Sequence, residues 1–398
     1  MFLLLKHFNF TNMKHIETIK ALCEHDGLSI AQLAAQTGNS VPTVTKYLNE
    51  LLQKGWITVA GKATGTHGRK PSIYRLCGHT AYFLGVDPKH NSLSLALMDL
   101  CGNVVAEYEE SILFQNTPEM IEVICTKCEK FLDESCIPKD RVQCVAFNIS
   151  GRVNPANGQS YSIFNFENNE DALSDTLSDR LGIRTLIDND TRLMAYGEMK
   201  TAIKGKYRDF LFINVGWGIG LSIIIDGKLY SGSDGFSGEF GHTSVYNNEV
   251  MCHCGKKGCL ETEVGGRAIC NHLQKRIAQG ETSSLKSKAA QGATLDEGDI
   301  INAALHDDML SIDVIETAGY ELGRQIANLI NLFNPQAVII GGSLQAAGDI
   351  FIEPIKIAVR RYSLRLISQN VAIIPSELAG RSGSIGACFK ARDFFLNE

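Results

Sequence analysis

Residues 239 to 261 read EFGHTSVYNNEVMCHCGKKGCLE, a segment that brings the imidazole of His242 and three thiols within eighteen residues. Three thiolates and one imidazole are the ligands of a closed, structural zinc site, whereas a catalytic site keeps one position open. The predicted metal ligands are His242, Cys252, Cys254 and Cys259. Two glycines before the last cysteine permit the sharp bend that so short a loop needs. The alternative is that the cysteines pack simply as small hydrophobic side chains.

Two carboxylates border this loop. Glu239 lies three residues before His242, and Glu261 lies two residues after Cys259. An ion held by the loop would therefore also fix the direction of both carboxylates. The sequence thus predicts a structural Zn²⁺ ion beside a polar ligand site.

The composition is that of an ordinary globular protein. The chain has 398 residues, 44% hydrophobic and 21% charged, so we expect two to three domains with proper cores. A net charge of −6 gives no overall case for nucleic-acid binding, and any such case must be local. Met1–Leu5 is apolar but too short for a signal peptide or a membrane span. Twelve cysteines without regular pairing favour reduced thiols in the cytoplasm.

Three amphipathic helical stretches open the chain. The first covers about residues 13 to 26, Ser29 caps the second, and Ser40 caps the third, which ends at Gly55. Two strands follow at 56–59 and 72–76, with a basic loop between them. A short helix, a glycine-containing turn, a longer helix and a wing predict a winged helix-turn-helix.

This module has the charge that DNA binding needs. Residues 40 to 75 carry six Lys and Arg side chains against one acidic residue, Glu50, which gives a local charge of +5. The predicted DNA-binding residues lie on the third helix and the wing: Ser40, Thr43, Thr45, Lys46, His67, Arg69 and Lys70. The alternative is a helical subdomain that binds another protein.

From Tyr82 onward, strands alternate with helices. Apolar runs typical of strands occur at 83–86, 92–97, 142–149, 185–187, 209–215, 221–225 and 337–340. Helical patterns cover 118–133 and 313–333, so the sequence predicts an α/β protein with two sheets. Three polar or glycine-rich segments stand at strand ends, where α/β folds bind ligands: Asp188–Asp190, Gly216–Gly220 and Gly341–Ser343.

Together these motifs resemble the ROK family of repressors and sugar kinases. The matches are Asn189-Asp190, Gly216-x-Gly-Ile-Gly220, Ile225-Asp-Gly-Lys-Leu-Tyr230, Gly238-Glu239-x-Gly-His242, Cys252-x-Cys-Gly-x-x-Gly-Cys-x-Glu261, Asn334-Pro335 with Gly341-Gly342, and Gly383-Ser-Ile-Gly-Ala387. The resemblance covers residues 81–398 and implies a two-lobed, actin-like and hexokinase-like ATPase fold. A winged helix in front is the arrangement of the family's transcriptional regulators, and residues 67–76 look like their wing.

The resemblance also implies domain boundaries. We expect a winged helix-turn-helix DNA-binding domain at 1–79 and a ROK sugar-binding domain at 80–398. Its first lobe would cover about 80–188 plus the C-terminal 378–398, and its second lobe about 189–377.

In this family a sugar binds in the cleft between the lobes. Carried over by motif, Asn189, Asp190, Glu239 and Glu261 would bind sugar hydroxyls, for which carboxylates are charge-assisted acceptors. His242 would ligate zinc with one ring nitrogen and face the sugar with the other. Gly151 and Arg152 resemble a segment that contacts the C2 substituent of amino sugars, which favours an N-acylated sugar.

The phosphate-binding motifs depart from those of the family's kinases. The kinases carry Asp-x-Gly-(Gly)-Thr at the first strand turn, where this chain has Asp87-Pro-Lys-His-Asn91, and Pro88 removes an amide donor. Trp217 stands where the kinases carry a small Thr or Ser. We therefore expect no enzymatic activity. Asp190, the general base of the kinases, would be catalytic only if this chain were a kinase.

The sequence thus predicts a sugar-responsive regulator, a repressor of carbohydrate-utilisation genes released from double-stranded operator DNA by a sugar or amino sugar. Structural Zn²⁺ would be its cofactor, and it would form a homodimer or homotetramer away from any membrane. The first alternative is an ATP-dependent kinase of a hexose or N-acetyl amino sugar that carries a DNA-binding domain. The second is a protein-interaction scaffold without a ligand.

Overall fold

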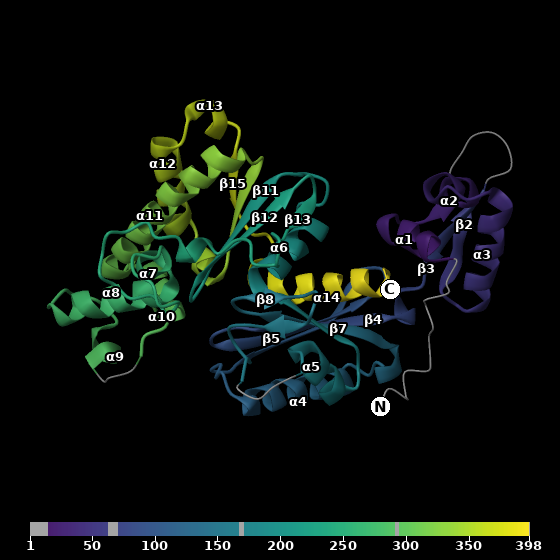
Figure 1. Ribbon diagram of the computed structural model, residues 1–398, viewed down its shortest axis with the longest axis horizontal. Helices are drawn as coiled ribbons and strands as arrows, with labels where there is room; N and C mark the ends of the chain where they lie inside the picture. The colour runs from purple at the N-terminus through teal and green to yellow at the C-terminus, as the bar shows by residue number, and fades with distance from the viewer. Residues whose placement is uncertain (1–14, 63–70, 167–170, 291–293, 398) are drawn as a thin grey trace. The chain divides into compact units, whose positions relative to one another are not determined.

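The computed structural model describes residues 15–62, 71–166, 171–290 and 294–397 (Figure 1). The chain divides into two compact units, the first formed by residues 1–148, 166–187 and 387–398 and the second by 149–165 and 188–386. The segment 149–165, between two strands of the first unit, thus packs with the second. Of the predicted DNA-binding residues, His67, Arg69 and Lys70 lie outside the described residues.

A winged helix-turn-helix forms the N-terminal part of the first unit. Its elements are α1 (Ile16–Glu24), β1 (Leu28–Ser29), α2 (Ile30–Thr37), α3 (Val41–Gln53), β2 (Ile57–Lys62) and β3 (Ser72–Leu76), with sheet order β1-β3-β2. The predicted caps are confirmed. The Ser29 side chain accepts from the backbone N–H of Gln32 in a capping box, and the Ser40 side chain accepts from that of Thr43. The buried side chains of Ile19, Leu33 and Leu48 form part of the core between the helices.

The rest of the first unit is a five-stranded mixed sheet of order β10-β7-β4-β5-β6. Its strands are β4 (Tyr82–Pro88), β5 (Ser92–Asp99), β6 (Val104–Ser111), β7 (Val142–Ile149) and β10 (Thr185–Asn189). Strand β4 pairs antiparallel with β5 and parallel with β7. Helices α4 (Pro118–Glu134) and α5 (Leu173–Leu181) lie on one face, and the end of α14 (Ser382–Phe395) lies on the other (Figure 1).

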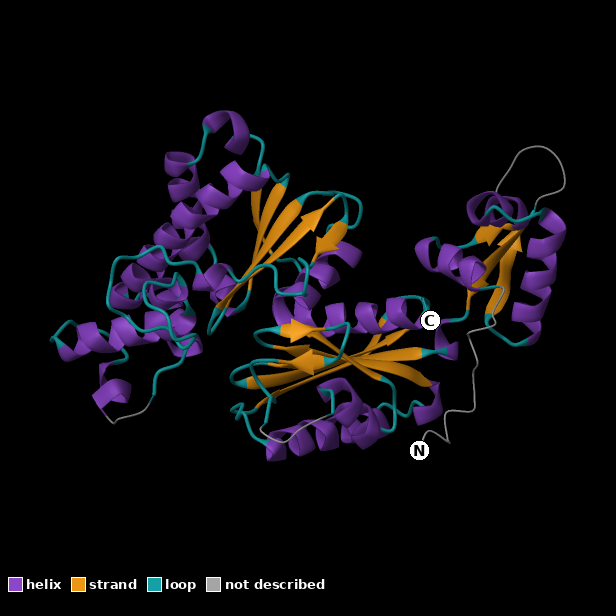
Figure 2. Cartoon of the chain, in the orientation of Figure 1, coloured by secondary structure: helices purple, strands orange, loops and turns teal. Residues whose placement is uncertain are grey.

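The second unit is built around another five-stranded sheet, of order β13-β12-β11-β14-β15 (Figure 2). Its strands are β11 (Phe210–Val215), β12 (Ile219–Ile225), β13 (Lys228–Tyr230), β14 (Ala337–Gly341) and β15 (Ala372–Pro375). Its helices are α6 (Asp190–Lys200), α7 (Glu261–Val264), α8 (Gly266–Ala278), α9 (Lys286–Ala290), α10 (Glu297–Leu305), α11 (Met309–Phe333), α12 (Asp349–Tyr362) and α13 (Arg365–Ser368). Short strands β8 (Val153–Asn154) and β9 (Gln159–Ser160) pair with each other.

Both faces of this second sheet are apolar because helices cover both of them. Along β11, Leu211 and Ile213 point into a large core with residues of α8, α10, α11 and α12. The alternate residues Phe210 and Phe212 point to the opposite core, which includes Ala195 of α6. This alternation explains why β11 reads as a continuous apolar run in the sequence.

Two glycines let α11 and α12 pack closely. A Cβ atom on Gly323 would lie 2.6 Å from the Ile355 carbonyl oxygen and 2.8 Å from the Ala358 Cβ. A Cβ on Gly319 would lie 2.7 Å from the Phe351 carbonyl oxygen. The neighbours are carbonyl oxygens and an alanine Cβ, none of which can rotate away, so only glycine fits at this crossing.

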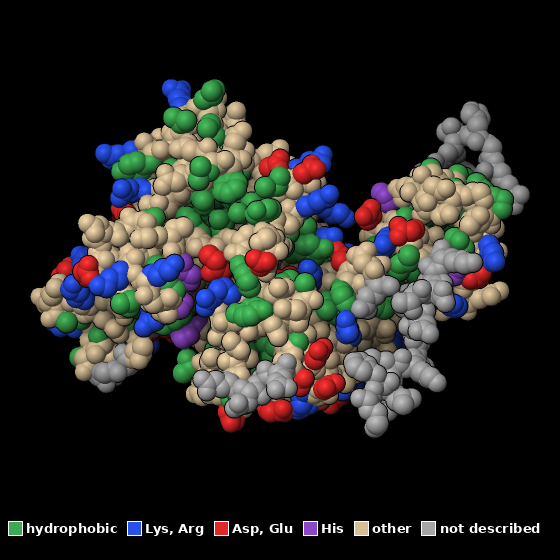
Figure 3. All heavy atoms as spheres, in the orientation of Figure 1, with side chains coloured by type: hydrophobic (Ala, Val, Ile, Leu, Met, Phe, Trp, Pro, Cys, Tyr) green, Lys and Arg blue, Asp and Glu red, His purple; other side chains and the backbone are tan. Residues whose placement is uncertain are grey.

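Figure 3 shows acidic and basic side chains interspersed over the displayed face, in keeping with the modest net charge. Among the helices in the described ranges, none is both long enough and apolar enough to cross a membrane.

The α11–α12 crossing yields a stability prediction. Replacing Gly323 by Ala should lower the free energy of unfolding by about 1–2 kcal/mol, because contacts below 3 Å place the overpacking cost in the upper part of its range, about 2–3 kcal/mol, against a helix-propensity gain of about 1 kcal/mol. Glu316→Ala, an exposed position on the same helix, should change it by less than about 0.5 kcal/mol. Urea denaturation of both variants measures the difference, and equal stability would contradict the close-packing argument.

Candidate functional site

The polar segment at the end of β10 forms one half of the candidate site. Asp190 is partly buried at the start of α6, and its Oδ2 accepts from the Ser150 hydroxyl at 2.8 Å. Its Oδ1 accepts from the Thr191 backbone N–H at 2.7 Å and from the Asn189 Nδ2 at 3.0 Å. Burial raises the pKa of the Asp190 carboxyl, and these hydrogen bonds oppose the shift. The carboxylate is held in one orientation before any ligand arrives.

Asn189 joins this carboxylate to the neighbouring loop. Its side-chain oxygen accepts from the Arg192 backbone N–H and so caps α6, which sets the orientation of the amide. Its Nδ2 then donates to the Gly151 carbonyl oxygen at 2.9 Å. Gly151 has a φ of +86°, and the adjacent Arg152 is exposed. The structure therefore brings Gly151, Asn189 and Asp190 together, as the motifs imply.

A buried ion pair below this loop was not anticipated from the sequence. Arg192 and Asp188 are each 3% exposed, and the Arg192 Nη2 lies 2.6 Å from the Asp188 Oδ1. The guanidinium also donates to the carbonyl oxygens of Val153 and Gly235. It thus ties the 153 and 235 segments to the end of β10. Asp188 and Arg192 are four residues apart across the start of a helix, and this spacing is the signal in the sequence that indicates an ion pair.

The glycine turn between β11 and β12 holds the second carboxylate. The Glu261 Oε2 accepts from the Ile219 backbone N–H at 3.0 Å. A Cβ on Gly218 would lie 2.6 Å from this Oε2, and a Cβ on Gly220 would lie 2.1 Å from the Thr191 hydroxyl oxygen. A side chain at Gly220 would also meet the Thr191 Cβ at 2.9 Å, and one at Gly218 would have to displace the Glu261 carboxylate, because the turn packs directly against both residues.

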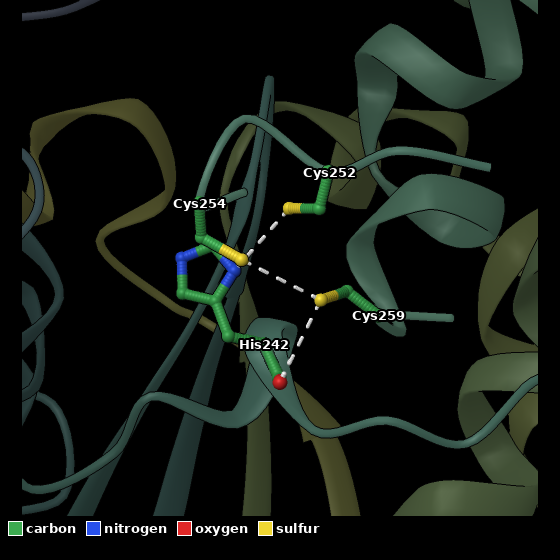
Figure 4. A group of neighbouring side chains, drawn as sticks. All are labelled: His242, Cys252, Cys254 and Cys259. Atoms are coloured by element: carbon green, nitrogen blue, oxygen red, sulfur yellow. Dashed lines mark hydrogen bonds between the residues drawn. The ribbon is translucent and has the colours of Figure 1, made fainter. Parts of the chain in front are cut away.

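The predicted metal ligands converge in the loop between η4 (Phe240–His242) and α7 (Figure 4). One ligand atom from each of His242, Cys252, Cys254 and Cys259 lies within 4.8 Å of all the others. The His242 Nδ1 is 3.6 Å from the Cys252 Sγ, and the Cys254 and Cys259 sulfurs are 3.7 Å apart. A tetrahedron with Zn–S bonds of about 2.3 Å places sulfurs about 3.8 Å apart. The donor set and its spacing fit zinc.

Burial shifts the pKa of two of these thiols upward. It raises the pKa of Cys252 and raises that of Cys259 to about 12, so both are neutral thiols before an ion binds. Thiolate ligation therefore requires that binding of an ion releases their protons.

The other ring nitrogen of His242 faces the carboxylate side. The His242 Nε2 lies 3.9 Å from the Glu239 Oε2, and the Glu239 side chain is 39% exposed. His253, between the first two cysteines, was not anticipated as a site residue. Its Nδ1 lies 3.1 Å from the Glu261 Oε1, and its ring contacts that of His242 at 5.1 Å. With Cys252 and Glu261 it forms a second group of possible metal ligands.

In the winged helix-turn-helix, some charged side chains on and near α3 already have partners. Arg75 donates to the Asp26 Oδ2 at 3.1 Å, and Glu50 lies 2.8 Å from the His15 Nε2. Lys46 is exposed on α3. The number of basic residues in the sequence therefore overstates the positive charge that is free to contact DNA, because the charge of Arg75 is offset by Asp26. Lys46 remains available on the exposed face of α3.

Two family models match the chain. The ROK family model matches residues 83–393, and a winged helix-turn-helix DNA-binding model matches residues 14–58. The chain is 25% identical to the xylose repressor of Caldicellulosiruptor bescii over 95% of its own length and 96% of that protein. It is 28% identical to the DNA-binding transcriptional dual regulator NagC of Escherichia coli over 94% of its own length and 91% of that protein.

A solved structure agrees with these relatives. The crystal structure of a ROK family transcriptional regulator, described as a homologue of the E. coli MLC protein, superposes with a TM-score of 0.78. The two chains are 26% identical, and the match covers 96% of this chain and 97% of the other.

The chain belongs to the ROK family. The expected fold class is confirmed: a winged helix-turn-helix precedes an α/β domain of the actin-like, hexokinase-like type. This is the architecture of a DNA-binding transcriptional regulator, as expected.

The sulfur spacing yields a metal prediction. Purified protein should contain about one zinc ion per chain, and Cys259→Ser should remove it, because three ligands bind zinc far more weakly than four. Cys136→Ser, at an exposed cysteine of the first unit, should retain the metal. Elemental analysis after gel filtration measures the content, and zinc retained by the Cys259 variant would contradict the assigned ligand set.

Proposed function

We propose that this protein is a repressor of carbohydrate-utilisation genes that binds operator DNA and releases it when a sugar or amino sugar binds its second unit. The relatives named xylose repressor and NagC support this class of effector. The observation that carries the proposal is the position of Glu261, which borders both the thiol cluster and the glycine turn that reaches the Asp190 segment.

The remaining hydrogen-bonding capacity of the segment suits hydroxyl groups. The Asp190 Oδ2 accepts only the Ser150 hydroxyl among the described residues, so one lone pair can accept from a sugar hydroxyl. Asn189 uses both amide hydrogens within the protein, at Gly151 and Asp190. In this proposal Asp190, Glu239 and Glu261 accept from the sugar, while Asn189 mainly positions Asp190 and Gly151.

Zinc would hold the second wall of the site. Bound by His242 and the three cysteines, it supplies a rigid cross-link between η4 and the start of α7. Because Glu239 and Glu261 flank those ligands, the cross-link fixes both carboxylates. The His242 Nε2, on the Glu239 side, remains available to a sugar hydroxyl.

We further propose that the protein has no kinase activity. Asp87 accepts from the Asn148 Nδ2 at 2.9 Å and lies 3.8 Å from the Lys89 Nζ, which offsets its charge. The Lys89 N–H donates to the Ser92 carbonyl oxygen within the β4–β5 hairpin. Trp217 packs against the core of the second unit. These contacts occupy groups that a phosphate cradle needs. Transfer of phosphate from ATP to a hexose at about 1–100 s⁻¹ would instead support the kinase alternative.

Operator binding sets the expected partners and compartment. Helix-turn-helix proteins bind paired half-sites as dimers, so we expect at least a homodimer, with a homotetramer as the larger option. Because its operator would lie on the chromosome, the protein would act in the cytoplasm.

A matched pair of glutamates tests the sugar site. Glu261→Gln should weaken sugar binding about tenfold or more, since hydrogen bonds to charged groups contribute about 1.5–3 kcal/mol. Gln retains an oxygen that can accept from Ile219. Glu263→Gln, two residues along α7, should bind normally, because Glu263 faces Asn248 and His272. Thermal shifts with xylose, glucose and N-acetylglucosamine measure the binding.

Either of two results would contradict the assignment. One is a wild-type protein that none of these sugars stabilises at millimolar concentration. The other is an equal thermal shift in both variants, which would place the sugar away from Glu261.

A further inference from the structure

The exposed face of α3 carries an apolar side chain where a DNA-binding helix meets the bases. Val41 is the first residue of α3, and 51% of its surface is exposed. In helix-turn-helix proteins the N-terminal residues of the recognition helix contact base edges in the major groove. A single exposed valine is ordinary on a protein surface, and what distinguishes Val41 is its position at the start of the recognition helix.

The hydroxyl groups around Val41 have partners within the helix. The Ser40 and Thr43 hydroxyls hydrogen-bond to each other at 2.8 Å, and the Ser40 Oγ also caps α3. The Thr45 hydroxyl donates to the Val41 carbonyl oxygen at 2.8 Å. Base readout through these hydroxyls would have to break or share those bonds. The methyl groups of Val41 and Thr45 need no such exchange.

Only one apolar group is displayed by base edges in the major groove, the C5-methyl of thymine. We infer that Val41 and Thr45 form a methyl-lined surface that reads thymine in the operator. The two residues stand one helical turn apart, a rise of about 5.4–6 Å. Base pairs are about 3.4 Å apart, so the thymines recognised lie one or two base pairs from each other.

The neighbouring residues agree with an A·T-rich half-site. Asn49, exposed one further turn along α3, has the paired donor and acceptor that match the N6 and N7 of adenine. Lys46, also exposed, can reach a phosphate or a guanine. The helix thus presents methyl groups at its start and polar groups farther along.

The size of the effect follows from one methyl group. Burial of a methyl contributes about 0.8 kcal/mol, which corresponds to about fourfold in affinity. Replacing thymine by deoxyuridine removes only that methyl and leaves every hydrogen-bonding group of the base unchanged. Val41→Ala removes the protein's side of the same contact.

The test begins with a preferred operator selected by the full-length protein from a random duplex library. Each thymine is then replaced in turn by deoxyuridine, and affinity is measured by fluorescence anisotropy at fixed salt. We expect about fourfold weaker binding at one or two neighbouring positions in each half-site. For Val41→Ala, deoxyuridine at one of those positions should change affinity less than 1.5-fold (an expected coupling of about 0.8 kcal/mol).

Val59→Ala is the matched control. Val59 is a similarly exposed valine, 49% exposed, but it lies on β2 of the wing. It should keep the wild-type response to deoxyuridine, because Val59 does not lie on the helix that reads the major groove. Circular dichroism checks that each variant is folded, and Val41→Ser provides a second variant at the same position.

Three outcomes would overturn the inference. The first is a selected half-site without thymine. The second is that no deoxyuridine substitution weakens binding. The third is that deoxyuridine lowers affinity equally in the wild type and in both Val41 variants. The inference rests on the proposed binding of operator DNA by α3. The library selection separates failure of that function from failure of thymine readout, because a protein that selects no sequence would contradict operator binding itself. Selection of a sequence without methyl sensitivity fails only the thymine readout.

Discussion

The four ligand atoms of His242, Cys252, Cys254 and Cys259 are the constraint on which the rest of the second unit's site depends. Between η4 and α7 the chain has only two isolated bridges, Ser244 with Cys259 and Met251 with Lys257. Loop hydrogen bonds, such as that from the Leu260 N–H to the Thr243 carbonyl oxygen, complete the backbone pairing of this segment, and Glu261 accepts from the Ile219 N–H. The sulfur and nitrogen atoms lie at the edge lengths of a zinc tetrahedron. In the proposed function, an ion bound there would cross-link η4 to the start of α7 and so hold Glu239 and Glu261 in place.

Glycine transmits this constraint to the other half of the site. The turn at Gly218 and Gly220 lies against Glu261 on one side and Thr191 on the other, so a side chain at either glycine would displace one of these two residues. A glycine-rich turn at a strand end ordinarily suggests phosphate binding. Here the same residues serve close packing, and the adjacent Trp217 packs against the core of the second unit. In the proposed regulator, these glycines would support the wall of the sugar site by close packing.

Much of this site could be predicted because its signals are local in sequence. Ligand spacing at 242–259, capping serines at 29 and 40, and the apolar run of β11 each depend on neighbours within a few residues. The spacing of Asp188 and Arg192 allows an ion pair, but the carbonyl partners of Arg192 could not be predicted, because Val153 and Gly235 reach it only through tertiary folding. The partners of Arg75 and Thr45 were missed for a related reason. Residue type shows the ability to hydrogen-bond, and only the folded chain shows whether that ability is already used.

The regulator account makes its central claim about coupling between sugar and DNA. An effector that lowers operator affinity by some factor must, by linkage, have its own affinity lowered by operator DNA by the same factor. The direct measurement is isothermal titration of the zinc-loaded protein with its best-binding sugar, with and without saturating operator duplex, beside operator titrations with and without that sugar. The account predicts equal weakening in both directions, about 5–150-fold. Tight sugar binding with unchanged operator affinity would contradict it.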